Sequence, residues 1–87
     1  MKLLFCNFCY DIFSLAPEEK VCTCGRSRGA YDQDLLHAWY VGTAAIPLGF
    51  INSSFDEAMR AQPNDGMGER FVAFVIPKVC PTFRKVH

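Results

Sequence analysis

The apolar positions fall into short stretches separated by turn residues, which is typical of a small β-rich domain. Residues 2–5 and 10–15 flank one compact turn and predict a β-hairpin. Short strands at 20–22 and 28–31 frame a second turn. Together these strands predict a three-stranded ribbon in residues 1–31.

Further strands are predicted downstream. Residues 37–41 and 45–50 form a second hairpin candidate, and Pro47 places the later strand at an edge or marks its start, because proline donates no ladder hydrogen bond. Residues 69–76 form the strongest strand and are apolar on both faces. That pattern predicts a central position in a sheet or a face that meets a partner. The tail, residues 81–87, is expected to fray.

One helix is predicted after residues 52–53. Ser54 and Glu57 have the S-x-x-E spacing of a capping box, and Pro63 marks the end of the helix. The apolar residues at helical spacing predict one face that packs on a sheet; they are Phe55, Ala58 and Met59.

Composition narrows the class of protein. The 87 residues carry nine Lys+Arg and nine Asp+Glu, so the net charge of zero does not favour a generic polyanion binder. Hydrophobic residues make up 51% of the chain, which excludes a disordered protein. No apolar run approaches the roughly 20 residues of a membrane span, and none resembles a signal-peptide core. A cytoplasmic protein without a membrane partner is therefore expected.

Four of the five cysteines lie within nineteen residues, at positions 6, 9, 22 and 24. In a reducing compartment two close pairs of thiols are typical metal ligands, and zinc takes four sulfurs at about 2.3 Å. Gly25 follows the last thiol, where a knuckle often needs a positive φ. The sequence therefore predicts one structural zinc per chain, held by Cys6, Cys9, Cys22 and Cys24. Such a site would also staple a chain whose core is small.

Other arrangements of the cysteines remain open at this point. Two disulfides would form if the protein were secreted. Cys80 is interpreted as a spare, half-buried thiol, although it could replace Cys22 or Cys24 if their one-residue spacing strains the site. Iron in the same four thiolates would give one-electron transfer instead of a structural role.

The segments Phe5-Cys6-Asn7-Phe8-Cys9-Tyr10 and Val21-Cys22-Thr23-Cys24-Gly25 resemble the knuckle pairs of zinc ribbon and rubredoxin-like proteins. The likeness covers about the first thirty residues. Two features depart from the family pattern, namely Tyr10 in place of a glycine and the single spacer Thr23. The downstream half, from Ile46 to Phe71, looks like small bacteriophage proteins of unknown function. This second resemblance implies a host cytoplasm as the location and indicates no activity.

Few residues could carry catalysis. No Ser/His/Asp set, H-E-x-x-H motif or Walker loop is present, and a four-thiolate site has no open position for a catalytic water. The protein is therefore expected not to be an enzyme. Nucleic-acid binding is an alternative, because Lys20, Arg26 and Arg28 bracket the second knuckle and Phe8 and Tyr10 could stack on bases. These two aromatic residues are, however, expected to belong to the core.

The sequence as a whole predicts an α+β domain, in which an N-terminal four-cysteine zinc ribbon (1–31) continues into a small antiparallel sheet with one helix (32–80). The predicted function is a zinc-stabilised protein-interaction module that self-associates or binds a protein, which would be a host protein inhibited or redirected by a phage. Because the metal makes the knuckle tips rigid, the tips are natural contact points. The candidate contact residues are Asn7, Phe8, Tyr10, Arg26 and Arg28.

Overall fold

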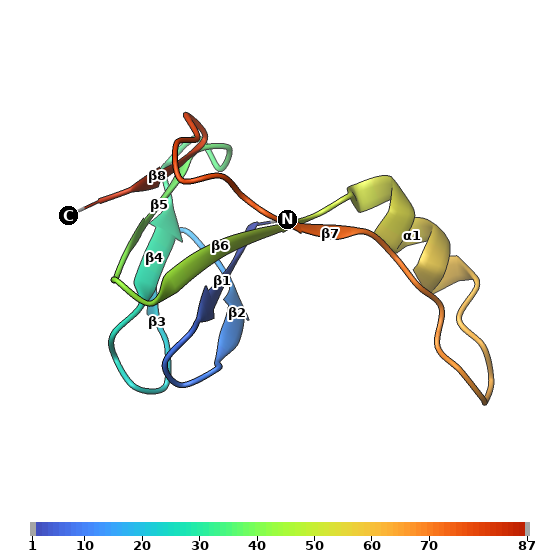
Figure 1. Ribbon diagram of the computed structural model, residues 1–87. Helices are drawn as coiled ribbons and strands as arrows, with labels where there is room; N and C mark the ends of the chain where they lie inside the picture. Colours follow the sequence, from blue (N-terminus) through green and yellow to red (C-terminus); the bar gives the residue numbers. More distant parts are fainter. Residues whose placement is uncertain (1, 87) are drawn as a thin grey trace.

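The structure is a computed structural model that describes residues 2–86. Within these residues the chain forms an α+β fold with two small sheets and one helix, as expected (Figure 1). In chain order the elements are β1 (Lys2–Cys6), β2 (Ile12–Ser14), β3 (Lys20–Val21), β4 (Arg28–Tyr31), β5 (Ala38–Val41), β6 (Ala45–Phe50), α1 (Asn52–Arg60), β7 (Ala73–Val75) and β8 (Phe83–Lys85).

The first sheet has the strand order β2-β1-β6-β7, and the second has the order β3-β4-β5-β8. All pairs are antiparallel except β5–β8, which is parallel. The predicted β1–β2 and β3–β4 hairpins both form, but each belongs to a different sheet. The three-stranded ribbon expected from the sequence is therefore wrong. Local turn residues determine a hairpin, but they do not determine which sheet it joins.

β5 and β6 are consecutive strands that do not pair with each other. After β5 the chain turns at Gly42 and enters the other sheet, so the predicted second hairpin does not form. β6 is also an interior strand, which contradicts the edge position expected for Pro47. Pro47 is tolerated because its carbonyl accepts a 2.9 Å hydrogen bond from Ile76 N, which directs the backbone of Pro47 towards β7. Its missing N–H therefore leaves the β1 ladder intact.

The core lies between the two sheets and draws side chains from both. Leu4 and Ala45 come from the first sheet, and Ala38, Tyr40 and Phe83 come from the second. Phe83 is fully buried, and its ring meets the Tyr40 ring edge to face at 5.2 Å. The C-terminal segment thus supplies a core strand, β8, and the expectation that it frays is wrong for residues 81–86, whereas residue 87 lies outside the described residues. We call these two packed sheets, residues 2–49 and 73–86, the body.

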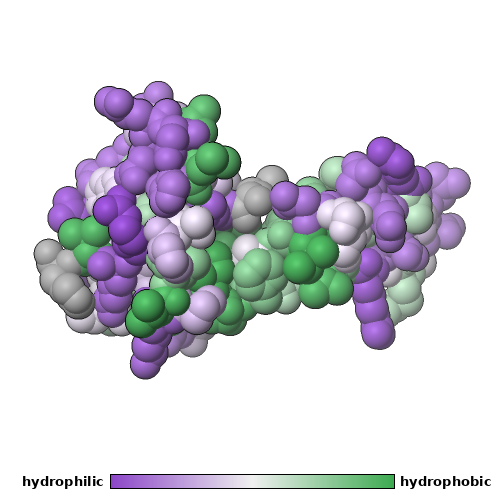
Figure 2. Space-filling view, turned by 90° about the horizontal axis from the view of Figure 1, so that it is seen from above, coloured by the Kyte–Doolittle hydropathy of each residue, from purple (hydrophilic) through white to green (hydrophobic). Residues whose placement is uncertain are grey.

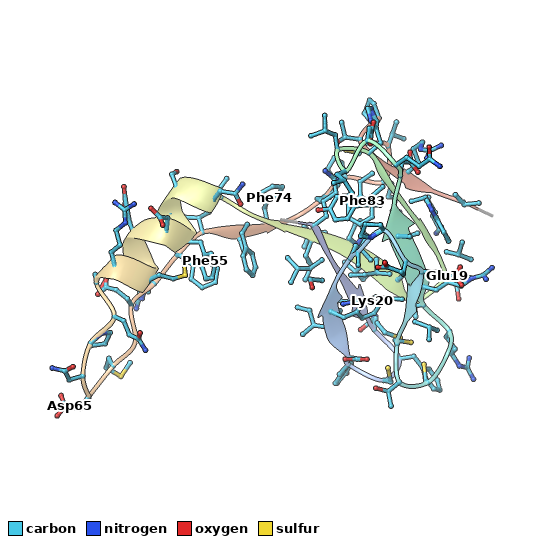
Figure 3. All side chains as sticks on the ribbon, turned by 180° about the vertical axis from the view of Figure 1, so that it is seen from behind. Glu19, Lys20, Phe55, Asp65, Phe74 and Phe83 are labelled. Carbon is cyan, nitrogen blue, oxygen red and sulfur yellow. The ribbon has the colours of Figure 1, made fainter. Side chains whose placement is uncertain are left out.

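Residues 50–72 project from one end of the body and form what we call the arm (Figure 1). The arm consists of α1 and a long exposed segment that returns to the body. Contrary to expectation, the helix does not lie across the face of a sheet. Instead the Phe55 ring meets the rings of Phe50, at the end of β6, and Phe71, and the three rings lie 4.9–5.2 Å apart. In Figure 3, Phe55 lies in the arm and Phe83 lies in the body.

The start of α1 also differs from the expectation. The N-cap residue is Ile51, and no side chain caps the helix. Ser54 Oγ instead accepts a 2.8 Å hydrogen bond from Val72 N, on the segment that returns from the arm. The S-x-x-E spacing therefore marks a helix but not a capping box. The predicted central strand is reduced to β7, which lies at the edge of the first sheet.

Candidate metal centre

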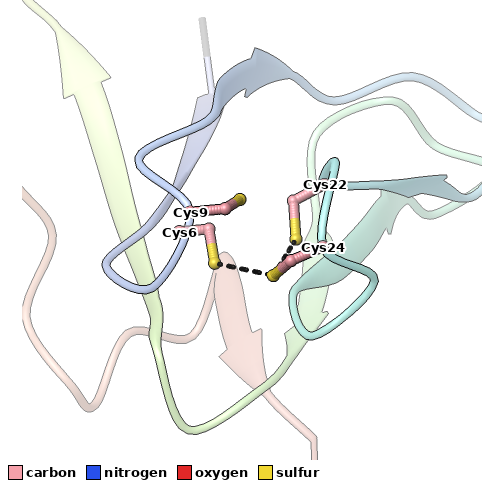
Figure 4. A group of neighbouring side chains, drawn as sticks. All are labelled: Cys6, Cys9, Cys22 and Cys24. Carbon is pink, nitrogen blue, oxygen red and sulfur yellow. Dashed lines mark hydrogen bonds between the residues drawn. The ribbon is translucent and has the colours of Figure 1, made fainter.

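The four clustered cysteines converge on one point between the two hairpins (Figure 4). The Sγ atoms of Cys6, Cys9, Cys22 and Cys24 all lie within 4.8 Å of one another. The Cys6–Cys24 sulfur distance is 3.7 Å, and the Cys22–Cys24 distance is 3.4 Å. The structure therefore brings together all four residues that the sequence singled out as ligands.

These distances match a tetrahedral metal site. Four sulfurs at about 2.3 Å from one ion are about 3.8 Å from each other, whereas a disulfide holds two sulfurs at about 2.05 Å. None of the five cysteines forms a disulfide in the described residues. The disulfide arrangement is therefore absent from the described structure, and the donor set fits a metal ion that prefers soft tetrahedral ligands.

The first knuckle links β1 to β2. Cys6 N donates to the Asp11 carbonyl at 2.9 Å, and Tyr10 N donates to the Cys6 carbonyl at 2.8 Å. These bonds fold the turn so that Cys6 and Cys9 face the same point. Tyr10 has a φ of 63°, the left-handed conformation that usually requires glycine at this position. Its ring stacks on Phe5 at 5.8 Å, which offsets part of the backbone strain.

The second knuckle links β3 to β4. Cys22 N donates to the Ser27 carbonyl at 2.8 Å, and Gly25 N donates to the Cys22 carbonyl at 3.0 Å. Gly25 has a φ of 81°, which confirms the role predicted from its position. Ser27 N also donates to Cys22 Sγ at 3.3 Å. The single spacer Thr23 is therefore compatible with both sulfurs reaching the site.

A polar clasp joins the two knuckles beside the sulfurs. Asp11 Oδ2 accepts hydrogen bonds from Thr23 N and Thr23 Oγ1, both at 3.0 Å. This pair was not predicted from the sequence, because the interaction depends on two loops meeting in space. The usable signal was an acidic residue directly after the first knuckle and a hydroxyl residue between the second pair of thiols.

The link between β5 and β6 touches both knuckles. Ala44 O accepts a hydrogen bond from Asn7 N at 2.8 Å. Gly42 has a φ of 132°, and a Cβ at this position would lie 2.5 Å from the Arg26 carbonyl oxygen. Glycine is therefore required here for both conformation and space. The switch between the sheets thus also holds the metal centre in place.

The pKa values of the thiols differ widely. The interaction with the Ser27 hydroxyl is the main cause that lowers the pKa of Cys6 to about 6. This hydroxyl is fully buried and forms no hydrogen bond of ordinary geometry within the described residues. Although the Arg26 amide lowers the pKa of Cys24, burial and the three neighbouring thiols raise it to about 12. Four thiolates cannot share this volume unless a cation offsets their charge.

The loop 32–37, between β4 and β5, has the same backbone pattern as the second knuckle but contains no thiols. Asp32 N donates to the His37 carbonyl at 2.8 Å, and Leu35 N donates to the Asp32 carbonyl at 3.0 Å, with a φ of 61° at Leu35. Asp34 Oδ1 accepts the Leu36 and His37 amides, both at 3.0 Å. The His37 amide is the main cause that lowers the pKa of Asp34 to about 2. The Asp34 carboxylate thus stabilises this loop through hydrogen bonds to backbone amides of the loop itself.

The predicted contact residues have different surroundings. Phe8 and Tyr10 are 60% and 73% exposed at the first knuckle, so the expectation that they belong to the core is wrong. The Arg26 guanidinium lies 3.9 Å from the Phe8 ring centroid, and Asn7 is exposed beside them. Arg28, in contrast, lies on β4 and pairs with Glu19 at 3.5 Å. The structure therefore groups the first four at the knuckle tips and leaves Arg28 outside.

Cys80 is half-buried and lies outside the sulfur quartet. Its Sγ lies 3.4 Å from Thr82 Oγ1, and its side chain packs against the core of the body. The predicted half-buried position of Cys80 is therefore confirmed, and the four clustered thiols do not include it. This placement also removes the reason to substitute Cys80 for Cys22 or Cys24.

The described residues thus define a small α+β protein with four cysteines placed to hold one metal ion. Comparisons with protein-family models, with curated proteins and with solved structures find no match for this chain. No helix in residues 2–86 has the length and apolar character needed to cross a membrane.

Proposed function

We propose that this chain is a small protein-interaction module that binds one structural zinc ion and presents its knuckle tips to a protein partner. The observation that carries the proposal is the convergence of four thiols beneath a group of exposed side chains. The tip consists of Asn7, Phe8, Tyr10 and Arg26. The likeness of the downstream half to bacteriophage proteins extends the proposal to a host protein as the partner, which the module inhibits or redirects.

Zinc suits the site because it is tetrahedral, accepts four thiolates and has no redox chemistry of its own. The four cysteines would hold it, and the Asp11–Thr23 clasp and Ser27 would orient the two knuckles around it. With four protein ligands no position remains for a catalytic water, so the proposed role is structural and not enzymatic. Iron in the same ligands is the alternative, and elemental analysis separates the two metals.

The tip is suited to recognition because its side chains are exposed while its backbone is fixed. Two backbone hydrogen bonds hold the first knuckle and two hold the second. A bound ion would join the two knuckles through coordinate bonds to the four sulfurs. A rigid tip loses little conformational freedom on binding, and aromatic and arginine side chains dominate the binding energy of many interfaces. Within this tip, Phe8 and Arg26 already form a cation–π pair that presents a flat mixed surface.

A capture experiment with matched variants tests the partner. We expect Phe8→Ser and Tyr10→Asn to lose a protein that the wild type retains, and asparagine keeps access to the left-handed backbone at position 10. Ile12→Ser is the control, because Ile12 is 52% exposed but lies on β2, outside the tip. Each variant should still bind one zinc per chain.

Two outcomes would contradict the proposal. A partner retained equally by the tip variants and the control would place the interface elsewhere. Capture that disappears after nuclease treatment and weakens steeply with salt would indicate nucleic-acid binding instead. The zero net charge of the chain and the pairing of Arg28 with Glu19 favour a protein partner over nucleic acid.

A further inference from the structure

The outer edge of β7 lacks the charged residues that two of the other three edge strands, β3 and β8, carry. β3 and β8 carry charged residues within the strand, namely Lys20 in β3 and Arg84 and Lys85 in β8. β2 has no charged residue within the strand, although the charged Asp11 directly precedes it. Charges of this kind discourage the pairing of exposed edges. Residues 71–77, which include β7, carry no charge at all.

The backbone of β7 offers unused hydrogen-bonding groups on this edge. Val72 O accepts a bond from Ile51 N, and Ile76 N donates to Pro47 O, both at 2.9 Å, so these two residues direct their backbone towards β6. Because backbone direction alternates along a strand, Ala73 and Val75 direct their N–H and C=O groups outwards. No strand of the described residues pairs with that side.

The side chains along this edge are also exposed and apolar. Val72 is 55% exposed, Phe74 is 43% exposed and Val75 is 66% exposed. The Phe74 ring packs over Gly49 in β6, which fixes its position on one face of the sheet. Figure 2 shows hydrophobic side chains gathered along the stretch that joins the two ends of the molecule. This apolar edge, residues 72–75, is long enough to accept one short strand.

We propose that β7 pairs antiparallel with β7 of a second copy of this chain, centred on Phe74. In this register Ala73 exchanges two hydrogen bonds with the partner's Val75, and Val75 exchanges two with the partner's Ala73. Phe74 then lies opposite the partner's Phe74 as a non-hydrogen-bonded pair on the same face. The two four-stranded sheets become one continuous sheet around a twofold axis. This pairing does not depend on the partner of the knuckle tips.

The strand that pairs with this edge belongs to a second copy of the chain, because the outward hydrogen-bonding groups of β7 are complementary to those of another β7. The two outward residues, Ala73 and Val75, are equally distant from Phe74, so one twofold axis satisfies every outward donor and acceptor of the strand. The strand is uncharged throughout, so self-pairing places no like charges opposite each other within it. β7 extends only from Ala73 to Val75, which limits the pairing to four backbone hydrogen bonds. The resulting dimer is concentration-dependent and not permanent.

A matched pair of lysine variants tests the edge. The wild type should show a mass that rises with concentration from 9.8 kDa towards twice that value in sedimentation equilibrium. Val75→Lys should remain monomeric, because it places a charge in the paired edge. Val79→Lys is the control, since Val79 is 88% exposed but lies outside β7. It should dimerise like the wild type.

Amide exchange in the unmodified protein tests the register without relying on a variant. The Ala73 and Val75 amides should be protected at high protein concentration and exchange rapidly at low concentration, whereas the Phe74 amide, which faces β6, should be protected at both. A chain that stays monomeric at every concentration overturns the proposal. A dimer that Val75→Lys leaves intact, or one that protects none of the β7 amides, overturns it equally.

Discussion

The body buries its apolar side chains between two sheets, whereas the arm leaves most of its apolar side chains at the surface. Phe83 and Leu4 are fully buried in the body. In the arm, Phe71 remains 38% exposed and Met59 remains 52% exposed, and the buried apolar residue of α1 is Ala58. One short chain thus contains a well-packed region and a region whose packing is incomplete.

The difference follows from what holds each region together. The body has two sheets that cover each other and a thiol quartet that joins two hairpins. The arm depends on the three rings of Phe50, Phe55 and Phe71 and on two hydrogen bonds to Val72. Regions with few buried contacts open at a low free-energy cost. We therefore expect the body to unfold last and the arm to fluctuate around it.

Removal of the metal should produce the largest effect, and it should act on the body. Structural zinc contributes about 10–16 kcal/mol of apparent binding free energy in small zinc domains, which is comparable to the stability of a whole domain. Exhaustive chelation should therefore unfold the body and shift the fluorescence of Trp39, which lies in β5. Readdition of zinc should restore the signal. An unchanged melting temperature after complete metal removal would show that the sulfurs play no structural role.

Phe83→Ala should have the next largest effect. Truncation of a fully buried phenylalanine costs about 3–5 kcal/mol, and here it also removes the edge-to-face contact with Tyr40. Denaturant unfolding of the zinc-bound protein measures the loss. Val79→Ala is the matched control, because Val79 is 88% exposed, and it should leave the midpoint unchanged. Equal midpoints for the two variants would mean that the C-terminal strand does not dock.

Gly42→Ala tests the coupling between the sheet switch and the metal centre. The new methyl group would meet the Arg26 carbonyl, and alanine would be strained at a φ of 132°. Backbone strain of this kind costs about 1–3 kcal/mol. We expect a lower unfolding midpoint together with weaker zinc binding in a competition titration with a chelator. Gly66→Ala is a useful control, since Gly66 also has a positive φ but lies in the open loop of the arm.

The same contrast explains how far the sequence could predict the structure. The cysteine spacing predicted the four thiols that converge, and the turn residues predicted the β1–β2 and β3–β4 hairpins. These are local patterns. The assignment of each hairpin to a sheet was not predictable in the same way, because it depends on contacts between distant segments.

Individual residues show more clearly what could not be predicted from the sequence. Phe83 sits among polar and charged neighbours in the sequence, which predicted a frayed tail, yet its contact with Tyr40 makes it a core residue. Ser54 has the spacing of a helix cap, but its hydroxyl instead accepts a hydrogen bond from Val72 N, eighteen residues away. The Asp11–Thr23 clasp likewise forms only when two loops meet. Each of these outcomes depends on tertiary contacts that no local pattern contains.

Phe71→Ala should have the smallest effect of the four changes and should confine it to the arm. The ring is already 38% exposed, so its loss costs less than the truncation of a buried phenylalanine, about 1–2 kcal/mol on the scale of apolar area. Amide exchange should accelerate along α1 while the amides of β4 and β5 keep their protection. Met67→Ala, at a side chain that is 89% exposed in the same arm, should change neither group. If Phe71→Ala lowers protection throughout the body, the arm and body unfold as one unit and the distinction between them fails.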